Sequence, residues 1–197
     1  LHKPNSSILF DERLKVNNSS SNNFIFSDID LIFESKKNVD ALICNFELQI
    51  PLVNQAQNLF KNIYKILNKD GYFCFNLLTL NSFVTLKKIF LEIDDNIFDG
   101  AQLRFGPFHD ISNIISALND NKFKEVVVST ESIEINYKSL NKIRKDFKEL
   151  GISNYYREKS RSNKNFYKKT TSLFKELVAK HDYIPVEFEI STFTSWK

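Results

Sequence analysis

Glycine is scarce in this chain and is absent from its first seventy residues. The four glycines are Gly71, Gly100, Gly106 and Gly151. A loop that brings its backbone close to a nucleotide needs residues without Cβ, because they allow the tight turn and the close approach. The N-terminal third therefore offers no candidate for a glycine-rich loop of that kind.

Methionine is absent altogether, and the first residue is Leu1. Such an absence is unusual for a translated sequence of 197 residues. We therefore expect that the chain is an internal fragment of a longer protein or that the sequence omits some residues. Either case would account for the absence of a glycine-rich loop from the sequence.

Long apolar runs and a dominant charge are also lacking. No stretch approaches the roughly 18 apolar residues of a membrane span, and no signal peptide opens the chain. The net charge is +3, from 27 basic and 24 acidic residues, which is too balanced to imply extensive nucleic-acid binding. These absences predict a cytoplasmic protein without a membrane span and without a nucleic-acid partner.

The few cysteines and histidines do not indicate a metal site. Cys44 and Cys74 each lie within an apolar run, where a free cysteine behaves as a small hydrophobe. A core role is commoner for such thiols than a disulfide, a metal site or a nucleophile. Because His2, His109 and His181 show no ligand spacing, we predict no bound metal.

The hydrophobic content is sufficient for one core of ordinary size. Hydrophobic residues make up 42% of the chain, and nineteen of them are phenylalanine. Residues 1–23 are mostly polar and asparagine-rich, which predicts a loosely held N-terminal segment. Residues 24–197 are then expected to form one α/β domain.

The middle of the chain predicts a strand, helix and strand with short connections. Residues 39–44 are apolar enough for a strand buried on both faces, as in a parallel sheet. Pro51 suits the first turn of a helix that reaches Leu67, with Phe60, Ile63, Tyr64 and Leu67 on one face. Gly71 suits the left-handed position after this helix. With a strand from Tyr72 to Leu80, this unit predicts parallel pairing.

The C-terminal half predicts further helices and strands. Asp110 suits the N-cap of a helix, and Val186, Phe188 and Ile190 alternate with polar residues, which is typical of an antiparallel strand. We therefore expect a mixed sheet. The elements predicted here are strands at 123–128, 132–137 and 184–193 and helices at 140–150 and 163–180.

Three segments after residue 25 resemble a known family. They are FSDIDLIF at 26–33, VDALICNFELQ at 39–49 and LNKDGYF at 67–73. Their order and spacing are similar to those of class I S-adenosylmethionine-dependent methyltransferases. The third segment departs from the family's common turn, because Asp70 replaces a proline, Tyr72 replaces a second glycine and Asn68 is an extra residue.

The C-terminal third resembles one branch of that family, the BioC-like branch. This branch includes malonyl-carrier-protein O-methyltransferases of biotin synthesis and relatives that assist respiratory complex I assembly. The opening ILFDERL at 8–14 also resembles the branch, so the first strand and its glycine loop would be missing between about Leu14 and Phe24. The matching C-terminal pieces are RFGPF at 104–108, Tyr137, LGISN at 150–154 with Arg157, IPVEFE at 184–189, and Trp196 with Lys197.

The resemblance implies a Rossmann-like methyltransferase fold of the α/β class. Its sheet would be mixed and mostly parallel with an antiparallel C-terminal strand, and residues 137–180 would form a helical lid insertion. The implied function is S-adenosylmethionine-dependent methylation of a small or carrier-bound carboxylic acid. Two alternatives stay open: a hydroxylase-like or complex I assembly role on the same scaffold, and a non-catalytic binding module with a degenerate cofactor site.

The cofactor is expected beyond the carboxyl ends of the strands, where ligands of open α/β sheets bind. This position selects Asp28, Ile29, Asn45, Phe46 and Leu48. The resemblance implies that Asp28 accepts a hydrogen bond from the adenine amino group, that Ile29 packs on the ring, and that Asn45 and Phe46 border the methionine end. Alternatively, Asp28 satisfies only its own turn and Asn45 only ends a strand.

No catalytic residue is assigned, because a methyl sulfonium already carries a good leaving group and needs mainly positioning in a dry pocket. Arg104 is a candidate partner for a substrate carboxylate, with a structural ion pair as the alternative. Tyr137, Asn154 and Arg157 are further substrate or partner candidates through the resemblance alone.

A basic stretch precedes and enters the helix expected at 163–180. Complementary charge steers the encounter of two proteins, so this stretch is a candidate docking face for an acidic acyl carrier protein. A solvated helix face is the alternative, and the sequence does not determine the oligomeric state. The residues of the stretch are Arg157, Lys159, Arg161, Lys164, Lys168 and Lys169.

Overall fold

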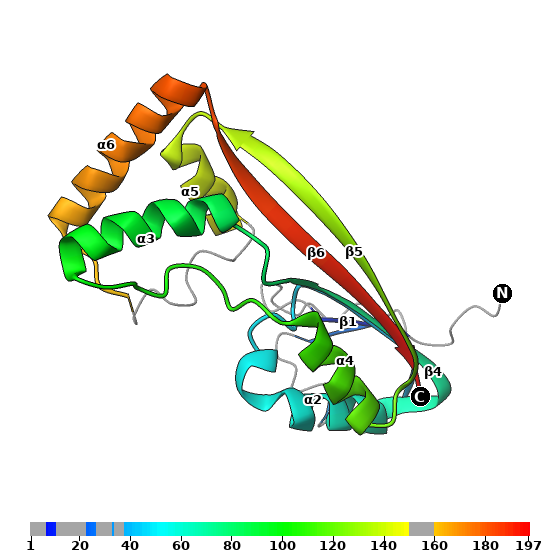
Figure 1. The fold of residues 1–197 in the computed structure, drawn as a ribbon. Helices are drawn as coiled ribbons and strands as arrows, with labels where there is room; N and C mark the ends of the chain where they lie inside the picture. The colour runs from blue at the N-terminus through cyan, green and yellow to red at the C-terminus, as the bar shows by residue number, and fades with distance from the viewer. Residues whose placement is uncertain (1–6, 11–22, 27–32, 34–37, 150–159) are drawn as a thin grey trace. The chain divides into compact units, whose positions relative to one another are not determined.

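The computed structural model describes residues 7–10, 23–26, 33, 38–149 and 160–197 (Figure 1). The chain divides into two compact units, which are described separately. The first unit comprises Leu1–Leu80, Phe108–Glu131 and Ile190–Lys197, and the second comprises Asn81–Pro107 and Ser132–Glu189. The predicted division into residues 1–23 and 24–197, with a lid at 137–180, stays a prediction.

The first unit is built on a mixed sheet. Strand β3 (Val39–Asn45) pairs in parallel with β4 (Leu67–Leu78). Strand β6 (Ile184–Trp196) pairs antiparallel with β4, from Tyr72 opposite Trp196 to Leu78 opposite Ile190. The strand order is β3-β4-β6-β5, where β5 is Lys124–Tyr137. The predicted α/β class, the mixed sheet and the antiparallel C-terminal strand are confirmed.

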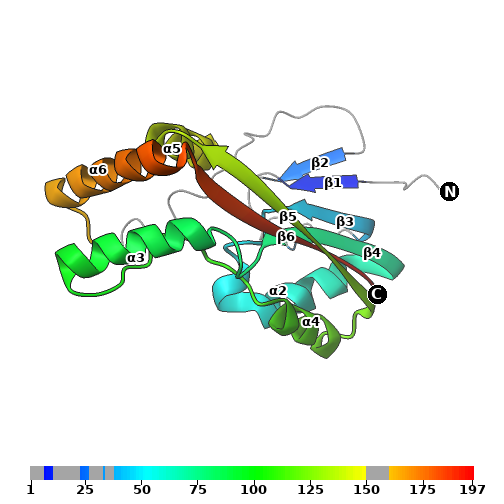
Figure 2. The ribbon, with the colours of Figure 1, turned by 45° about the horizontal axis from the view of Figure 1, so that its top comes forward.

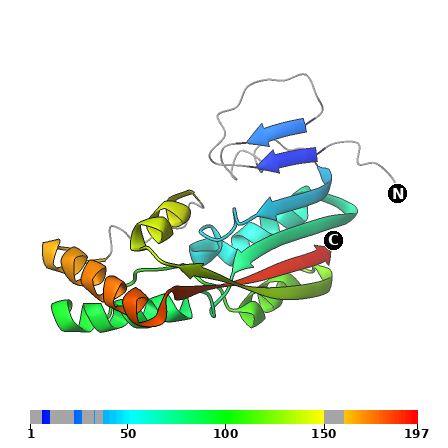
Figure 3. The same ribbon diagram turned by 90° about the horizontal axis from the view of Figure 1, so that it is seen from above.

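Two short strands precede this sheet in the sequence. Strands β1 (Ser7–Phe10) and β2 (Asn23–Phe26) pair in parallel, with Ser7 opposite Asn23 and Phe10 opposite Phe26. Figures 2 and 3 show β1 beside β3. A strand therefore lies at Ser7–Phe10, within the segment expected to be loosely held.

An aromatic cluster forms the core of the first unit. Phe75 stacks on Phe73 at 4.7 Å and on Phe193 at 4.9 Å between ring centroids. Phe60, fully buried on helix α2 (Leu52–Ile66), meets both Phe73 and Phe75. Of the predicted stripe, Phe60 and Ile63 are buried and Tyr64 is half-buried on the face of α2 that covers the sheet, while Leu67 is buried as the first residue of β4.

Helix α4 (Ile111–Asp120) also packs in this unit and contacts α2. The predicted cap is confirmed, because the Asp110 side chain accepts a hydrogen bond from the backbone N–H of Asn113 at 3.1 Å. Ile114 and Leu118 are buried one turn apart. The cap therefore begins the helix with its apolar face toward the core.

The predicted role of Gly71 is wrong. Helix α2 ends at Ile66, and Gly71 lies inside β4 without a left-handed backbone. Asp70 takes that conformation instead, with φ of 59°. A Cβ at Gly71 would lie 2.8 Å from the backbone oxygen of Asn68, so the close approach of the backbone three residues earlier accounts for the glycine.

The described residues of the second unit form helices that pack around another aromatic group. They are α3 (Val84–Phe98), α5 (Leu140–Glu149) and α6 (Lys164–His181). Phe83 stacks on Phe147 of α5 at 4.7 Å and meets Phe188 edge-on at 4.9 Å. Helix α3 contacts α6, and α3 was not predicted from the sequence.

The two long strands differ from the prediction in one respect each. Residues 124–137 form the single strand β5, where two strands were expected. In β6, Val186 and Phe188 are buried as predicted, but Ile190 is not, and Ser191 and Phe193 are buried in its place. The buried face of β6 changes at residues 189 and 190, where the chain passes from one unit to the other.

Two further properties are visible in the described part of the chain. None of its helices combines the length and the apolar character needed to cross a membrane. Cys44 and Cys74 are free thiols; Cys44 is buried in the core, and Cys74 is half-buried.

Candidate functional site

The carboxyl ends of β3 and β4 carry two asparagines directly opposite each other. Asn45 pairs with Asn76 in the strand register, and the Asn76 side-chain amide donates to Asn45 Oδ1 at 2.8 Å. The backbone N–H of Phe46 donates to Asn76 Oδ1 at 2.8 Å. Since Phe46 has a left-handed backbone with φ of 60°, the chain turns sharply here, and the amide pair supports that turn.

A second polar link lies further along the same edge. The buried Gln49 side chain accepts from Leu78 N at 2.8 Å and donates to Leu78 O at 3.0 Å. This reciprocal pair ties the loop after β3 to the last residue of β4. The ends of the two strands are therefore joined by side-chain amides, which supply donors and acceptors without a net charge.

His109 completes this edge. Its Nε2 lies 2.7 Å from the backbone oxygen of Gln49, and because a carbonyl only accepts, Nε2 carries the proton. Burial lowers the pKa of His109 below its ordinary value of 6.5, while the hydrogen bond that Nε2 donates to the Gln49 carbonyl opposes that change. At neutral pH the imidazole is therefore uncharged and Nδ1 is a free-base nitrogen.

Cys44, next to Asn45, does not act as a nucleophile at neutral pH. Burial, with smaller contributions from Glu47 and Cys74, raises its pKa to about 12. The thiol is therefore protonated, and only a thiolate attacks electrophiles efficiently. Among the described residues, no cluster of His, Cys, Asp or Glu suits a metal ion.

The predicted cofactor residues fall into three groups. Asp28 and Ile29 lie outside the described residues. Asn45 is exposed and Phe46 half-buried at the strand ends, where a ligand can reach them. Leu48 is completely buried in the core cluster, so it supports the loop from within, and its contact with a cofactor stays a prediction.

Arg104 is held in an ion pair within the second unit. Its Nε lies 3.0 Å from Asp94 Oδ2, and both side chains are almost fully buried. Its guanidinium carbon also lies 3.9 Å from the centre of the Phe166 ring. The structure thus shows the ion-pair arrangement for Arg104, and a role toward a substrate carboxylate stays a prediction.

Tyr137 also uses its polar group inside the second unit. The hydroxyl donates to Asp146 Oδ2 at 3.0 Å. Burial, followed by this hydrogen bond, raises the pKa of Tyr137 to about 12. The predicted candidates Asn154 and Arg157 lie outside the described residues.

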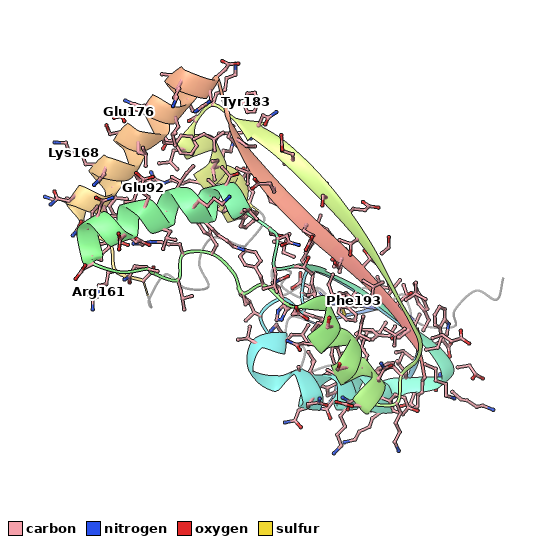
Figure 4. The ribbon with its side chains drawn as sticks, viewed as in Figure 1. Glu92, Arg161, Lys168, Glu176, Tyr183 and Phe193 are labelled. Atoms are coloured by element: carbon pink, nitrogen blue, oxygen red, sulfur yellow. The ribbon has the colours of Figure 1, made fainter. Side chains whose placement is uncertain are left out.

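The described part of the basic stretch lies at the start of α6. Asn163 caps the helix by accepting from Phe166 N at 2.8 Å, and Lys164 is the first helical residue. Arg161 and Lys164 are exposed, and Lys168 projects outward from α6 (Figure 4). Their exposure is compatible both with a docking face and with a solvated helix face.

Comparison with known proteins finds distant relatives. No protein-family model matches the chain. The chain is 24% identical over 163 residues to arginine-hydroxylase NDUFAF5, mitochondrial, of Dictyostelium discoideum, a match covering 81% of this chain and 37% of that protein. The mouse protein of the same name is 21% identical over 175 residues, covering 88% of this chain and 50% of that protein. The chain thus spans half or less of the length of these relatives.

Solved structures show what kind of fold this is. The YcgJ protein of Bacillus subtilis matches with a TM-score of 0.50 and 11% identity, over 90% of this chain and 72% of that one. The predicted Rossmann-like fold is confirmed. An S-adenosylmethionine-dependent methyltransferase of Archaeoglobus fulgidus matches with a TM-score of 0.44 and 12% identity, over 88% and 67% of the two chains.

Three residues of the strand-end edge were not predicted from the sequence: Gln49, Asn76 and His109. Asn76 follows the apolar run Tyr72 to Phe75 in a buried strand, and a polar residue there is a detectable signal. Gln49 was quoted only as part of the loop after the strand. His109 lies sixty residues from Gln49 in the sequence, and no local pattern indicates their contact.

Proposed function

We propose that this protein is an S-adenosylmethionine-dependent methyltransferase of the BioC-like branch. The cofactor would bind at the carboxyl ends of β3 and β4, and the methyl acceptor would be a small or carrier-bound carboxylic acid. The observation that carries the proposal is the linked amide edge of Asn45 and Asn76, placed where a Rossmann-like sheet binds its ligand.

The chemistry of this edge suits such a cofactor. The exposed amide of Asn45 offers donors and acceptors to the amino and carboxylate groups of its methionine part. The sulfonium itself needs an apolar, water-poor surrounding more than an acid or a base. The half-buried ring of Phe46, next to Asn45, supplies an apolar surface at the same point.

Calorimetric titration with S-adenosylmethionine tests cofactor binding. Asn45→Ala is expected to weaken binding by about tenfold, because one hydrogen bond to a charged group contributes about 1.5 kcal/mol. Asn119→Ala, at an exposed asparagine of α4, is the matched control and is expected to bind as the unaltered protein does. Absence of binding to the unaltered protein would favour the non-catalytic module.

Activity is tested by the appearance of S-adenosylhomocysteine in the presence of a carrier-bound dicarboxylic acid. Cofactor binding without this product, with every acid tried, would contradict methyl transfer to acids.

The docking face is tested by charge reversal at Arg161 and Lys164. Unchanged affinity for the acyl carrier protein at low salt would remove the docking idea.

A second candidate function is favoured by the comparisons. Both curated relatives are named arginine-hydroxylases, so hydroxylation of an arginine in a protein substrate, or an assembly role toward respiratory complex I, is the alternative. Mass spectrometry of candidate substrates separates the two reactions. Addition of one oxygen atom to an arginine would support hydroxylation, and addition of a methyl group to a carboxylate would support methylation.

A further inference from the structure

The second unit contains a pocket that none of the predicted sites includes as a whole. It has a volume of about 400 Å³ and is lined by residues of α3, α5 and α6, of the segment that follows α3 and of the segment that precedes α6 (Figure 1 shows these helices). This volume lies in the range of sites for small molecules. The aromatic part of its wall consists of Phe90, Phe105, Phe147, Phe166 and Tyr167.

The rim of this pocket is basic. Arg144 and Lys148 both line it from α5, and because they are four residues apart they lie on the same side of the helix. Both are exposed. No carboxylate is among the described residues that line the pocket.

The other cations of α5, Lys142 and Lys145, lie close to carboxylates of the same helix. Lys142 forms an ion pair with Asp146 at 2.6 Å, and Lys145 approaches Glu149 at 3.8 Å. Neither of these lysines lines the pocket. Arg144 and Lys148 form no ion pair within the described part of the chain, so the carboxylates of α5 do not neutralise the charge at the rim.

A third cation that lines the pocket, Arg104, already has a carboxylate partner. Arg104 lines the pocket but is paired with the buried Asp94, and its Nη1 lies 3.4 Å from Ser162 Oγ. Arg104 therefore shapes the wall, while Arg144 and Lys148 supply the uncompensated positive charge. Apolar aromatic walls with two cations on one side fit a ligand that has a ring and a single anionic group.

We propose that this pocket binds a small aromatic carboxylate, with the ring among the phenylalanines and the carboxylate held by Arg144 and Lys148. Aromatic side chains favour edge-on and offset contacts with a ligand ring. The planar guanidinium of Arg144 matches a carboxylate with two parallel hydrogen bonds. This proposal concerns ligand binding alone. It is therefore independent of methyl transfer, and its test needs no cofactor.

Calorimetry with matched ligands tests the class of ligand. Phenylbutyrate is expected to bind about fivefold or more tightly than phenylbutanol, which has the same ring and chain without the charge. Phenylbutylamine, with the opposite charge, is expected to bind more weakly than either. Added salt is expected to weaken phenylbutyrate binding and to leave phenylbutanol binding unchanged.

Matched variants of α5 test the residues. Arg144→Gln and Lys148→Gln are each expected to weaken phenylbutyrate binding by about three- to fivefold and to leave phenylbutanol binding unchanged. Lys145→Gln removes the same charge from the same helix outside the pocket and is expected to have no effect. Because all three side chains are exposed, circular dichroism is expected to show unaltered folding.

Three results would overturn the proposal. The first is a lack of saturable phenylbutyrate binding by the unaltered, folded protein. The second is equal affinity for phenylbutyrate and phenylbutanol, which would assign the pocket to neutral ligands. The third is an equal loss in Lys145→Gln and Arg144→Gln, which would indicate a general charge effect instead of a site.

Discussion

The two units have aromatic cores in common but use their polar side chains in different ways. At the strand ends of the first unit, neutral amides bond to one another and to the backbone, as Asn45, Asn76 and Gln49 show. In the second unit, ion pairs join helices and loops, and the pair of Arg104 with Asp94 is buried. The same chain therefore contains one edge that presents neutral hydrogen-bonding groups and one pocket that presents charge.

This difference has a physical consequence for each unit. Amide pairs keep their donors and acceptors over the whole accessible range of pH. A buried ion pair depends on both partners, because removing one leaves an uncompensated charge in the interior. We therefore expect the second unit to be more sensitive to the loss of a single charged side chain.

The largest effects are expected in the aromatic cores. Phe75→Ala in the first unit and Phe83→Ala in the second remove fully buried rings, and each is expected to lower the free energy of unfolding by about 3 to 5 kcal/mol. Hydrogen exchange is expected to show lost protection mainly in the unit that carries the substitution. Equal loss in both units would show that they unfold as one cooperative body.

Removal of the buried carboxylate is expected to come next. Asp94→Ala leaves Arg104, whose side chain is 8% exposed, without its partner and is expected to cost about 3 kcal/mol in denaturant unfolding. Glu149→Ala, which removes an exposed partner of Lys145, is the control. A similar loss in both variants would contradict the special role of the buried pair.

The helix caps allow a direct comparison between the units. Asp110 caps α4 in the first unit and Asn163 caps α6 in the second, each by accepting from a backbone N–H. Asp110→Ala and Asn163→Ala are each expected to lower the free energy of unfolding by about 1 kcal/mol. A much smaller effect at one position would show that its helix end is not stabilised by the cap.

The smallest expected effect is a change in pH dependence at His109. Burial lowers the pKa of His109 below 6.5, so the unfolded chain binds a proton more readily than the folded one. Stability is therefore expected to fall as the pH decreases through 6.5 and to be unaffected by this group above it. His109→Gln should flatten the acid side of the stability profile. An unaltered profile in His109→Gln would assign the acid sensitivity to other groups.

Local patterns predicted many elements because their causes are local. Apolar spacing placed the buried face of α2, Asp110 marked the start of α4, and the strand at Val39 followed from its apolar run. The prediction for Gly71 failed because Asp70 takes the left-handed backbone instead, and Gly71 continues β4 close to the backbone oxygen of Asn68. Helix α3 was missed, although Leu86, Ile89 and Ile93 follow a helical spacing.

Part of the candidate site was also predicted from local patterns in the sequence. Asn45 and Phe46 follow directly on a recognisable strand, so their position at its carboxyl end could be inferred. Their partner Asn76 lies 31 residues from Asn45 and 30 from Phe46, and these hydrogen bonds depend on strand register. Arg144 and Lys148 were not predicted, because on the sequence they are two cations among several on a polar helix.

By itself, the sequence determined the α/β class, the alternation of elements and the apolar faces, because these depend on periodicity and on caps within a few residues. Only the tertiary structure decided which side chains meet: Asn45 with Asn76, Gln49 with Leu78, and Arg104 with Asp94. The physical reason is that these contacts arise from strand register and packing between elements. Residue spacing along the chain does not contain that information.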